Sequence, residues 1–164
     1  MIAKMFCLIS MCLVMAACDR AEAPGCMWNW STRPLSDLSG QVQGAVEAAG
    51  LSGATASAVA FGEDCIDPKS GEVKRFATMQ TDFRITVPVG DVRNLDELGD
   101  LAEQVLEVLD SFPAKNTPGP QSGDVSISFE AGEERLHLWF SIMQADKARE
   151  QGLHGAALLE ALRQ

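Results

Sequence analysis

The alternation of apolar and polar positions is strongest between residues 73 and 89. Most odd positions of this stretch are apolar and most even positions are polar, which predicts a long strand with one buried face and one wet face. A single strand of this length is unusual, so we expect a bend or a bulge near residues 80–82. The same alternation predicts a strand over residues 55–61 and a hairpin over residues 125–143.

Apolar residues spaced by three and four positions predict three helices. The first takes Ser36 as its N-cap and ends at Gly50, which supplies a left-handed stop. The last occupies residues 146–163 and is divided by Gly152 and Gly155.

The middle helix has the clearest start, because Asn94 can accept hydrogen bonds from its first amide groups and Glu97 can reach back to the cap. Its apolar stripe predicts an amphipathic helix packed over a sheet. The opposite face is acidic and holds no Lys or Arg; it carries Asp96, Glu97, Asp100, Glu103, Glu107 and Asp110. We interpret this face as a solvated surface, and a basic partner is the alternative.

The predicted elements follow one another in the order α-β-β-α-β-β-α. This order predicts an α+β fold in the form of a two-layer sandwich, with a mainly antiparallel sheet of about four strands and helices on one face. We expect a single α+β domain over residues 34–164.

The chain is acidic, with 13 basic and 23 acidic residues and a net charge of −10. This charge argues against a nucleic-acid partner and against flat binding to anionic lipid, because both carry charge of the same sign. We interpret the acidic surface mainly as a solubility device.

The first eighteen residues, MIAKMFCLISMCLVMAAC, combine one cation, Lys4, with an apolar run and a small-residue end. The run is too short for a permanent membrane helix, so it predicts an export signal. Its end, Met15-Ala16-Ala17-Cys18, resembles that of bacterial lipoprotein precursors, in which an aliphatic residue and two small residues precede the cysteine that receives the lipid. The resemblance implies that residues 1–17 are a removed signal peptide and that Cys18 carries the lipid.

A lipid on Cys18 would attach the protein to a membrane outside the cytoplasm, on the periplasmic side or at the cell surface. Residues 18–33 would then be the lipidated cysteine and a tether. The seven residues that follow Cys18 reach at most about 25 Å. Two alternatives stay open: an ordinary secretory signal cut near Ala17 or after Ala23, and an uncleaved anchor.

The five cysteines divide by compartment. Cys7 and Cys12 leave with the signal and Cys18 takes the lipid, so Cys26 and Cys65 remain in an oxidising environment. We predict a disulfide between Cys26 and Cys65, with two separate thiols as the alternative.

Two tryptophans, Trp28 and Trp30, stand one residue apart near the end of the tether. In an extended segment both rings face one side. Because Cys26 would fix this segment to Cys65, we interpret the rings as packing against the domain; contact with a lipid headgroup layer is the alternative.

Four carboxylates surround the turn at residues 67–71: Glu63, Asp64, Asp67 and Glu72. Their spacing does not match an EF-hand loop, so a solvated acidic turn is preferred over a calcium site. The sequence shows no glycine-rich phosphate loop, no nucleophile elbow and no Cys or His spacing typical of zinc. His137 and His154 lie outside any motif.

We therefore predict a non-catalytic, cofactor-free domain that binds a protein of the envelope or a small ligand. The alternative is an envelope hydrolase with a carboxylate site, for example Asp64 with Asp67 or Asp82. Carboxylates that converge with raised pKa values in the largest pocket would favour the hydrolase, whereas a flat sheet face would favour the binding domain. A passive spacer ranks below both, because the tether is short.

Overall fold

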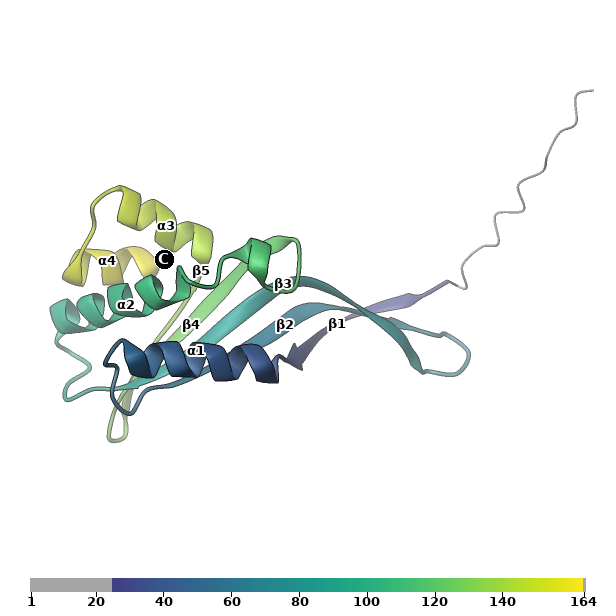
Figure 1. The fold of residues 1–164 in the computed structure, drawn as a ribbon, viewed down its shortest axis with the longest axis horizontal. Helices are drawn as coiled ribbons and strands as arrows, with labels where there is room; N and C mark the ends of the chain where they lie inside the picture. The colour runs from purple at the N-terminus through teal and green to yellow at the C-terminus, as the bar shows by residue number, and fades with distance from the viewer. Residues whose placement is uncertain (1–24, 164) are drawn as a thin grey trace, which may run out of the picture.

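The computed structural model describes residues 25–163, so the predicted signal peptide and the predicted lipid site at Cys18 lie outside the described residues. Five strands form one sheet in the order β1-β2-β3-β4-β5 (Figure 1). Their bounds are β1 Met27–Pro34, β2 Thr55–Ile66, β3 Val73–Pro88, β4 Gln121–Ala131 and β5 Glu134–Ser141. The helices are α1 Ser36–Ala48, α2 Leu95–Leu109, α3 Ile142–Glu150 and α4 Gly155–Leu162, with a short 3-10 helix, η1, at Ala114–Asn116.

The α+β class is confirmed, and two details of the predicted fold, the number of strands and their pairing, need correction. The sheet has five strands instead of about four, because β1 was not expected as a full member of the sheet. The sheet is mixed, since β3 and β4 are parallel and the other three pairs are antiparallel. The predicted division of the last helix is confirmed, since α3 and α4 are separated at Gly152, whose φ of 72° ends α3; the helical segment begins at Ile142 instead of Asp146.

β1 lies in the segment that the sequence assigned to the tether. Its side chains are exposed on both faces apart from Ser31, which is half-buried, so no alternation of buried and wet positions marks it as a strand. Backbone pairing with β2 over its whole length, from Met27 opposite Ile66 to Pro34 opposite Val59, makes it part of the sheet.

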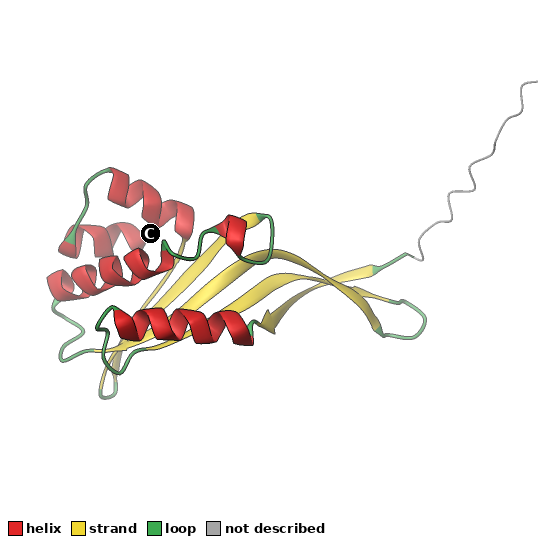
Figure 2. Cartoon of the chain, viewed as in Figure 1, coloured by secondary structure: helices red, strands yellow, loops and turns green. Residues whose placement is uncertain are grey.

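One face of the sheet carries the core. Phe83, Ile85 and Val87 of β3 lie opposite Val125, Ile127 and Phe129 of β4, and all six side chains are buried. Buried residues from all four helices join this single cluster, so the helices pack on one face of the sheet (Figure 2). The other face of the sheet carries polar and half-buried side chains and is not covered by any described helix.

α1 closes part of an edge of the sheet. Since β1 ends opposite Val59, the first residues of β2 have no β1 partner on that side. The side chain of Gln43 takes that place: its amide oxygen accepts from the Ala56 amide at 2.6 Å, and its amide nitrogen donates to the Ala54 carbonyl at 3.1 Å. One turn earlier, the Ser39 hydroxyl accepts from the Ala58 amide at 2.9 Å. The prediction of Ser36 as the N-cap is wrong, because Ser36 is the first residue of α1 and Leu35 holds the cap position without a side-chain hydrogen bond.

Part of the sheet extends beyond the helices. The last pair between β3 and β4 is Gln80 with Gln121, so residues 73–79 have only β2 beside them. Together with β1, the hairpin of β2 and β3 forms a three-stranded projection that no helix covers (Figure 1). We call residues 26–33 and 62–78 the arm. The sheet curls, and no helix packs on either face of the arm. The molecule is therefore a two-layer sandwich only where helices cover the sheet.

Two of the three register shifts of the long strands lie near the predicted bend; the third is between Cys65 and Ile66. β2 and β3 change register between Phe61 and Gly62, and β3 and β4 change register between Thr81 and Phe83. The expected irregularity near residues 80–82 is therefore confirmed, and it falls where the arm joins the rest of the sheet. No helix of the described part is long and apolar enough to cross a membrane.

Candidate functional site

The uncovered face of the sheet contains a small polar hollow between β3, β4 and β5. Its volume is about 210 Å³, and its lining residues are Asp82, Phe83, Arg84, Asp124, Ser126, His137 and Trp139. Strand pairing explains the grouping, because Arg84 lies opposite Ser126 on β4 and Ser126 lies opposite Trp139 on β5. Trp139 is 70% exposed, although it stands in the middle of a strand.

Two carboxylates, Asp82 and Asp124, meet at the start of β4. The Asp82 carboxylate accepts hydrogen bonds from the Gln80 side chain at 2.8 Å and from the Asp124 amide at 3.0 Å. Burial raises the pKa of Asp124, and the negative charge of Asp82 raises it further, while the side chains of Gln80 and Trp139 act in the opposite direction. A cation placed between the two carboxylates would relieve this repulsion.

His137 lies at the other side of the same hollow. Its Nδ1 is 3.0 Å from the hydroxyl of Ser128, which fixes the orientation of the ring. His137 and Trp139 are two positions apart on β5, so they share one strand face and both line the hollow.

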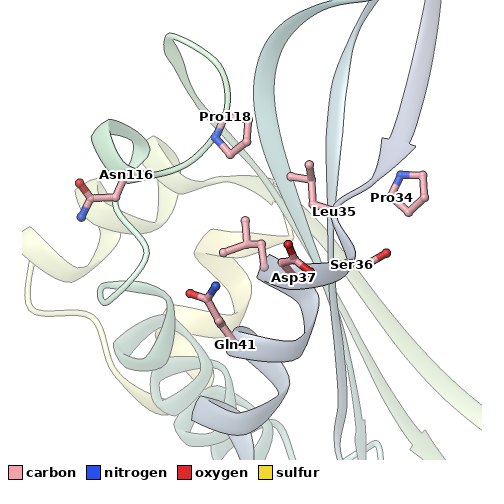
Figure 3. Close-up of a pocket in the computed structure, with 8 residues that line it drawn as sticks. Pro34, Leu35, Ser36, Asp37, Gln41, Asn116 and Pro118 are labelled. Atoms are coloured by element: carbon pink, nitrogen blue, oxygen red, sulfur yellow. The ribbon is translucent and has the colours of Figure 1, made fainter.

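A more spacious hollow, of about 430 Å³, lies at the start of α1 (Figure 3). Pro34, Leu35 and Gln41 line it on one side, and Asn116 at the end of η1 and Pro118 in the following loop line it on the other. Asp37 is the one titratable residue of its lining, so no carboxylates converge there.

The carboxylate pairs that the sequence suggested are not brought together. Asp64 forms an ion pair with Arg33 at 2.7 Å. Asp67 lies in the β2–β3 turn, where the amides of Lys69 and Ser70 donate to it and lower its pKa. Asp82 instead has Asp124 as its neighbour, a contact that depends on the parallel pairing of β3 with β4 and has no local sequence signal.

The acidic face of α2 is partly occupied by the C-terminal helices. Asp110 accepts two hydrogen bonds from Arg149 of α3, both at 2.8 Å. Glu103 contacts His154 at 2.9 Å, and Asp96 accepts from the Ala156 amide at 3.0 Å in the first turn of α4. Three of the six acids therefore bind groups of α3, α4 or the segment between them, which leaves less of this face for a basic partner.

The predicted disulfide is confirmed, since Cys26 and Cys65 lie at disulfide distance with Cα atoms 5.0 Å apart. The bond joins Cys26, the residue before β1, to Cys65 near the C-terminal end of β2. Among residues 25–163, no three His, Cys, Asp or Glu side chains come together as a metal site requires.

The two tryptophans of the arm pack on the sheet with one face only. The ring of Trp30 stacks on Phe61, with centroids 5.2 Å apart and planes 7° apart, and the guanidinium of Arg75 lies 5.1 Å from the Trp28 ring centre. Trp30 is still 57% exposed and Trp28 44% exposed. Packing against the domain, as the sequence suggested, therefore accounts for only part of each ring.

Comparison with known proteins identifies no relative: no protein-family model, no curated protein and no solved structure matches this chain. A function therefore has to be inferred from the fold and from these surfaces.

Proposed function

We propose that the protein is a lipid-anchored, non-catalytic protein of the cell envelope that binds a partner protein with the polar hollow of its uncovered sheet face. The observation that carries this proposal is Trp139, an indole exposed beside the paired carboxylates Asp82 and Asp124. Large aromatic side chains that stand exposed beside polar groups are typical of protein contact sites.

The size and the charge of the hollow favour a basic side chain of the partner. A volume of about 210 Å³ is smaller than the usual pocket for a small organic ligand, which starts at roughly 300 Å³. A lysine or arginine side chain would relieve the repulsion between the two aspartates and could lie against the Trp139 ring. The net charge of −10 would also speed the approach of a basic protein.

The anchor is tested by the intact mass of the protein recovered from membranes of its own host. A chain that starts at Cys18 with added lipid mass, and that gains two alkyl groups only after reduction, agrees with both the lipid and the disulfide. An unlipidated chain that starts elsewhere would contradict the anchor and leave a secreted protein.

The binding face is tested by site-specific photo-crosslinking in the host envelope. A crosslinker at position 139 should give a discrete adduct, whereas one at position 107, on the exposed acidic face of α2, should give none. Position 107 is the matched control, because it is exposed like position 139 and also lies on an acidic surface. Asp124→Asn should weaken the adduct at position 139, since the hollow then offers only one of its two anions to the basic side chain of the partner. Equal adducts at both positions would contradict the proposal.

An envelope hydrolase is the second candidate, favoured by the raised pKa of Asp124 beside Asp82. The more spacious hollow at the start of α1 argues against it, because Asp37 alone is titratable there. Release of soluble fragments from purified envelope glycan, abolished by Asp82→Asn and by Asp124→Asn, would favour the hydrolase over the binding protein.

A further inference from the structure

The arm differs from the rest of the molecule in its charge. It contains four cations, Arg33, Lys69, Lys74 and Arg75, and four anions, Glu63, Asp64, Asp67 and Glu72. The remaining described residues contain 7 basic and 17 acidic side chains, so they carry the whole net charge of −10. The arm is thus the neutral part of a strongly acidic protein.

The charges of the arm are also largely satisfied within it. Arg33 binds Asp64 at 2.7 Å, and Lys74 binds Glu72 at 3.0 Å. Arg75 lies over the Trp28 ring. A neutral surface whose ions are already paired meets little electrostatic repulsion from anionic lipid, whereas the acidic remainder is repelled.

The large exposed apolar side chains of the described residues lie mostly on this same arm. Met27, Trp28, Trp30 and Val73 belong to it, and only Trp139 and Met143 lie elsewhere. Trp28 and Trp30 stand two residues apart on one strand, so their rings are on one face. Indole rings with one covered face and one open face are typical of membrane–water interfaces, where their apolar and polar parts are both accommodated.

The position of the arm relative to the anchor is set by covalent bonds. Seven residues separate Cys18 from Cys26, and they span at most about 25–30 Å when extended. Cys26 is in turn joined to Cys65 on β2. A lipid on Cys18 therefore holds the arm closer to the bilayer than any other part of the described structure.

We propose that the arm lies on the headgroup layer of the membrane that carries the anchor, with the rings of Trp28 and Trp30 in the interface. This inference rests on the lipid anchor of the proposed function. The contact gives the domain a second attachment besides the lipid and fixes the orientation of the domain on the membrane.

The test uses the full-length lipidated protein, reconstituted in phosphatidylcholine vesicles with a fraction of phosphatidylglycerol. The chain has three tryptophans, so Trp139→Phe leaves Trp28 and Trp30 as the only indole reporters. Their emission should shift to the blue on reconstitution and should be quenched when the lipids are brominated near the headgroup end of the acyl chain. The matched control, Trp28→Phe with Trp30→Phe, keeps only Trp139, whose emission should be unchanged by the brominated lipid.

The outcomes separate the arm from the anchor. Protein that floats with the vesicles and carries lipid mass, but whose Trp28 and Trp30 emission is not quenched, would overturn the arm contact and leave the anchor intact. Protein without lipid mass that does not float would overturn the anchor, and the arm contact with it. Quenching of Trp139 to the same extent would also overturn the proposal, because the arm would then have no special place on the membrane.

Discussion

At the scale of single residues, two glycines form a very close contact between helices. A Cβ atom at Gly99 of α2 would overlap the backbone of Gly155, the first residue of α4. Position 99 must therefore be glycine for the two helices to touch, whereas position 155 favours glycine because its φ is 52°. Gly44 of α1 is a contrasting case, because a Cβ atom there meets nothing within 4 Å.

We predict opposite effects of alanine at Gly99 and at Gly44. Gly99→Ala should lower the free energy of unfolding by about 1–3 kcal/mol, because α4 has to move away from α2. Gly44→Ala should raise it by about 0.5–1 kcal/mol, because alanine favours the helix and causes no clash. Urea unfolding of the oxidised protein measures both changes. A neutral Gly99→Ala variant would show that α4 is not seated on α2 as described.

The contact of His154 with Glu103 predicts a pH dependence. The hydrogen bond and the charge of Glu103 raise the pKa of His154 above its ordinary value of 6.5. A raised pKa in the folded state means that the bound proton stabilises the fold below about pH 6.5, and that this stabilisation is lost as the pH rises through the folded-state pKa. The stability difference between the wild type and His154→Asn should therefore be present at mildly acidic pH and absent in alkaline solution.

An NMR titration of the His154 ring checks the cause of this shift. Glu103→Gln should move the His154 pKa back towards its ordinary value, since the charge of Glu103 is then removed. If the titration of His154 is the same in both proteins, the contact does not exist in solution.

At the scale of secondary-structure elements, α1 acts as a substitute strand for the first part of β2. Gln43→Ala removes both hydrogen bonds to Ala54 and Ala56 and leaves these backbone groups half-buried without a partner. We predict a loss of about 1–2 kcal/mol in the free energy of unfolding. Gln41→Ala, at an exposed position of the same helix, is the control and should have no comparable effect. Equal stabilities of the two variants would contradict this role of α1.

Elements with a strong periodic pattern were predictable from the sequence. The long alternation over residues 73–89 corresponds to β3, and the apolar stripe after Asn94 corresponds to α2. β1 was missed as a sheet strand, because its stability comes from backbone pairing and from Cys26 instead of from a buried face. The cap interaction of Asn94 was also wrong in detail, since its amide donates to the Glu97 side chain and caps no backbone group.

At the scale of the whole molecule, the site was less predictable than the elements. His137 and Trp139 share one strand face by simple alternation, so the sequence could group them. Asp82 and Asp124 are 42 residues apart, and they meet only because α2 crosses over the sheet and places β4 parallel to β3. Such a pairing depends on the global topology, which no local pattern encodes.

The disulfide should matter most for the arm. Closing a loop with a sequence separation of 39 stabilises the fold by at most about 4 kcal/mol in the chain-entropy model. We predict that Cys26→Ser with Cys65→Ser lowers the stability by up to this amount and exposes β1 first, since β1 buries little apolar surface. Limited proteolysis should then cut within residues 26–34 while the core remains protected. Uniform protection of β1 in the double variant would contradict this prediction.

The number and position of the cysteines also have a consequence for biogenesis. If the signal peptide is removed and Cys18 carries a lipid, as proposed, only Cys26 and Cys65 remain as thiols, so a single pairing is possible and no isomerase is needed to correct it. Both belong to the first 65 residues, which on the proposed export route would enter the oxidising compartment before α2, α3 and α4. The bond can therefore form on a chain that is still being exported.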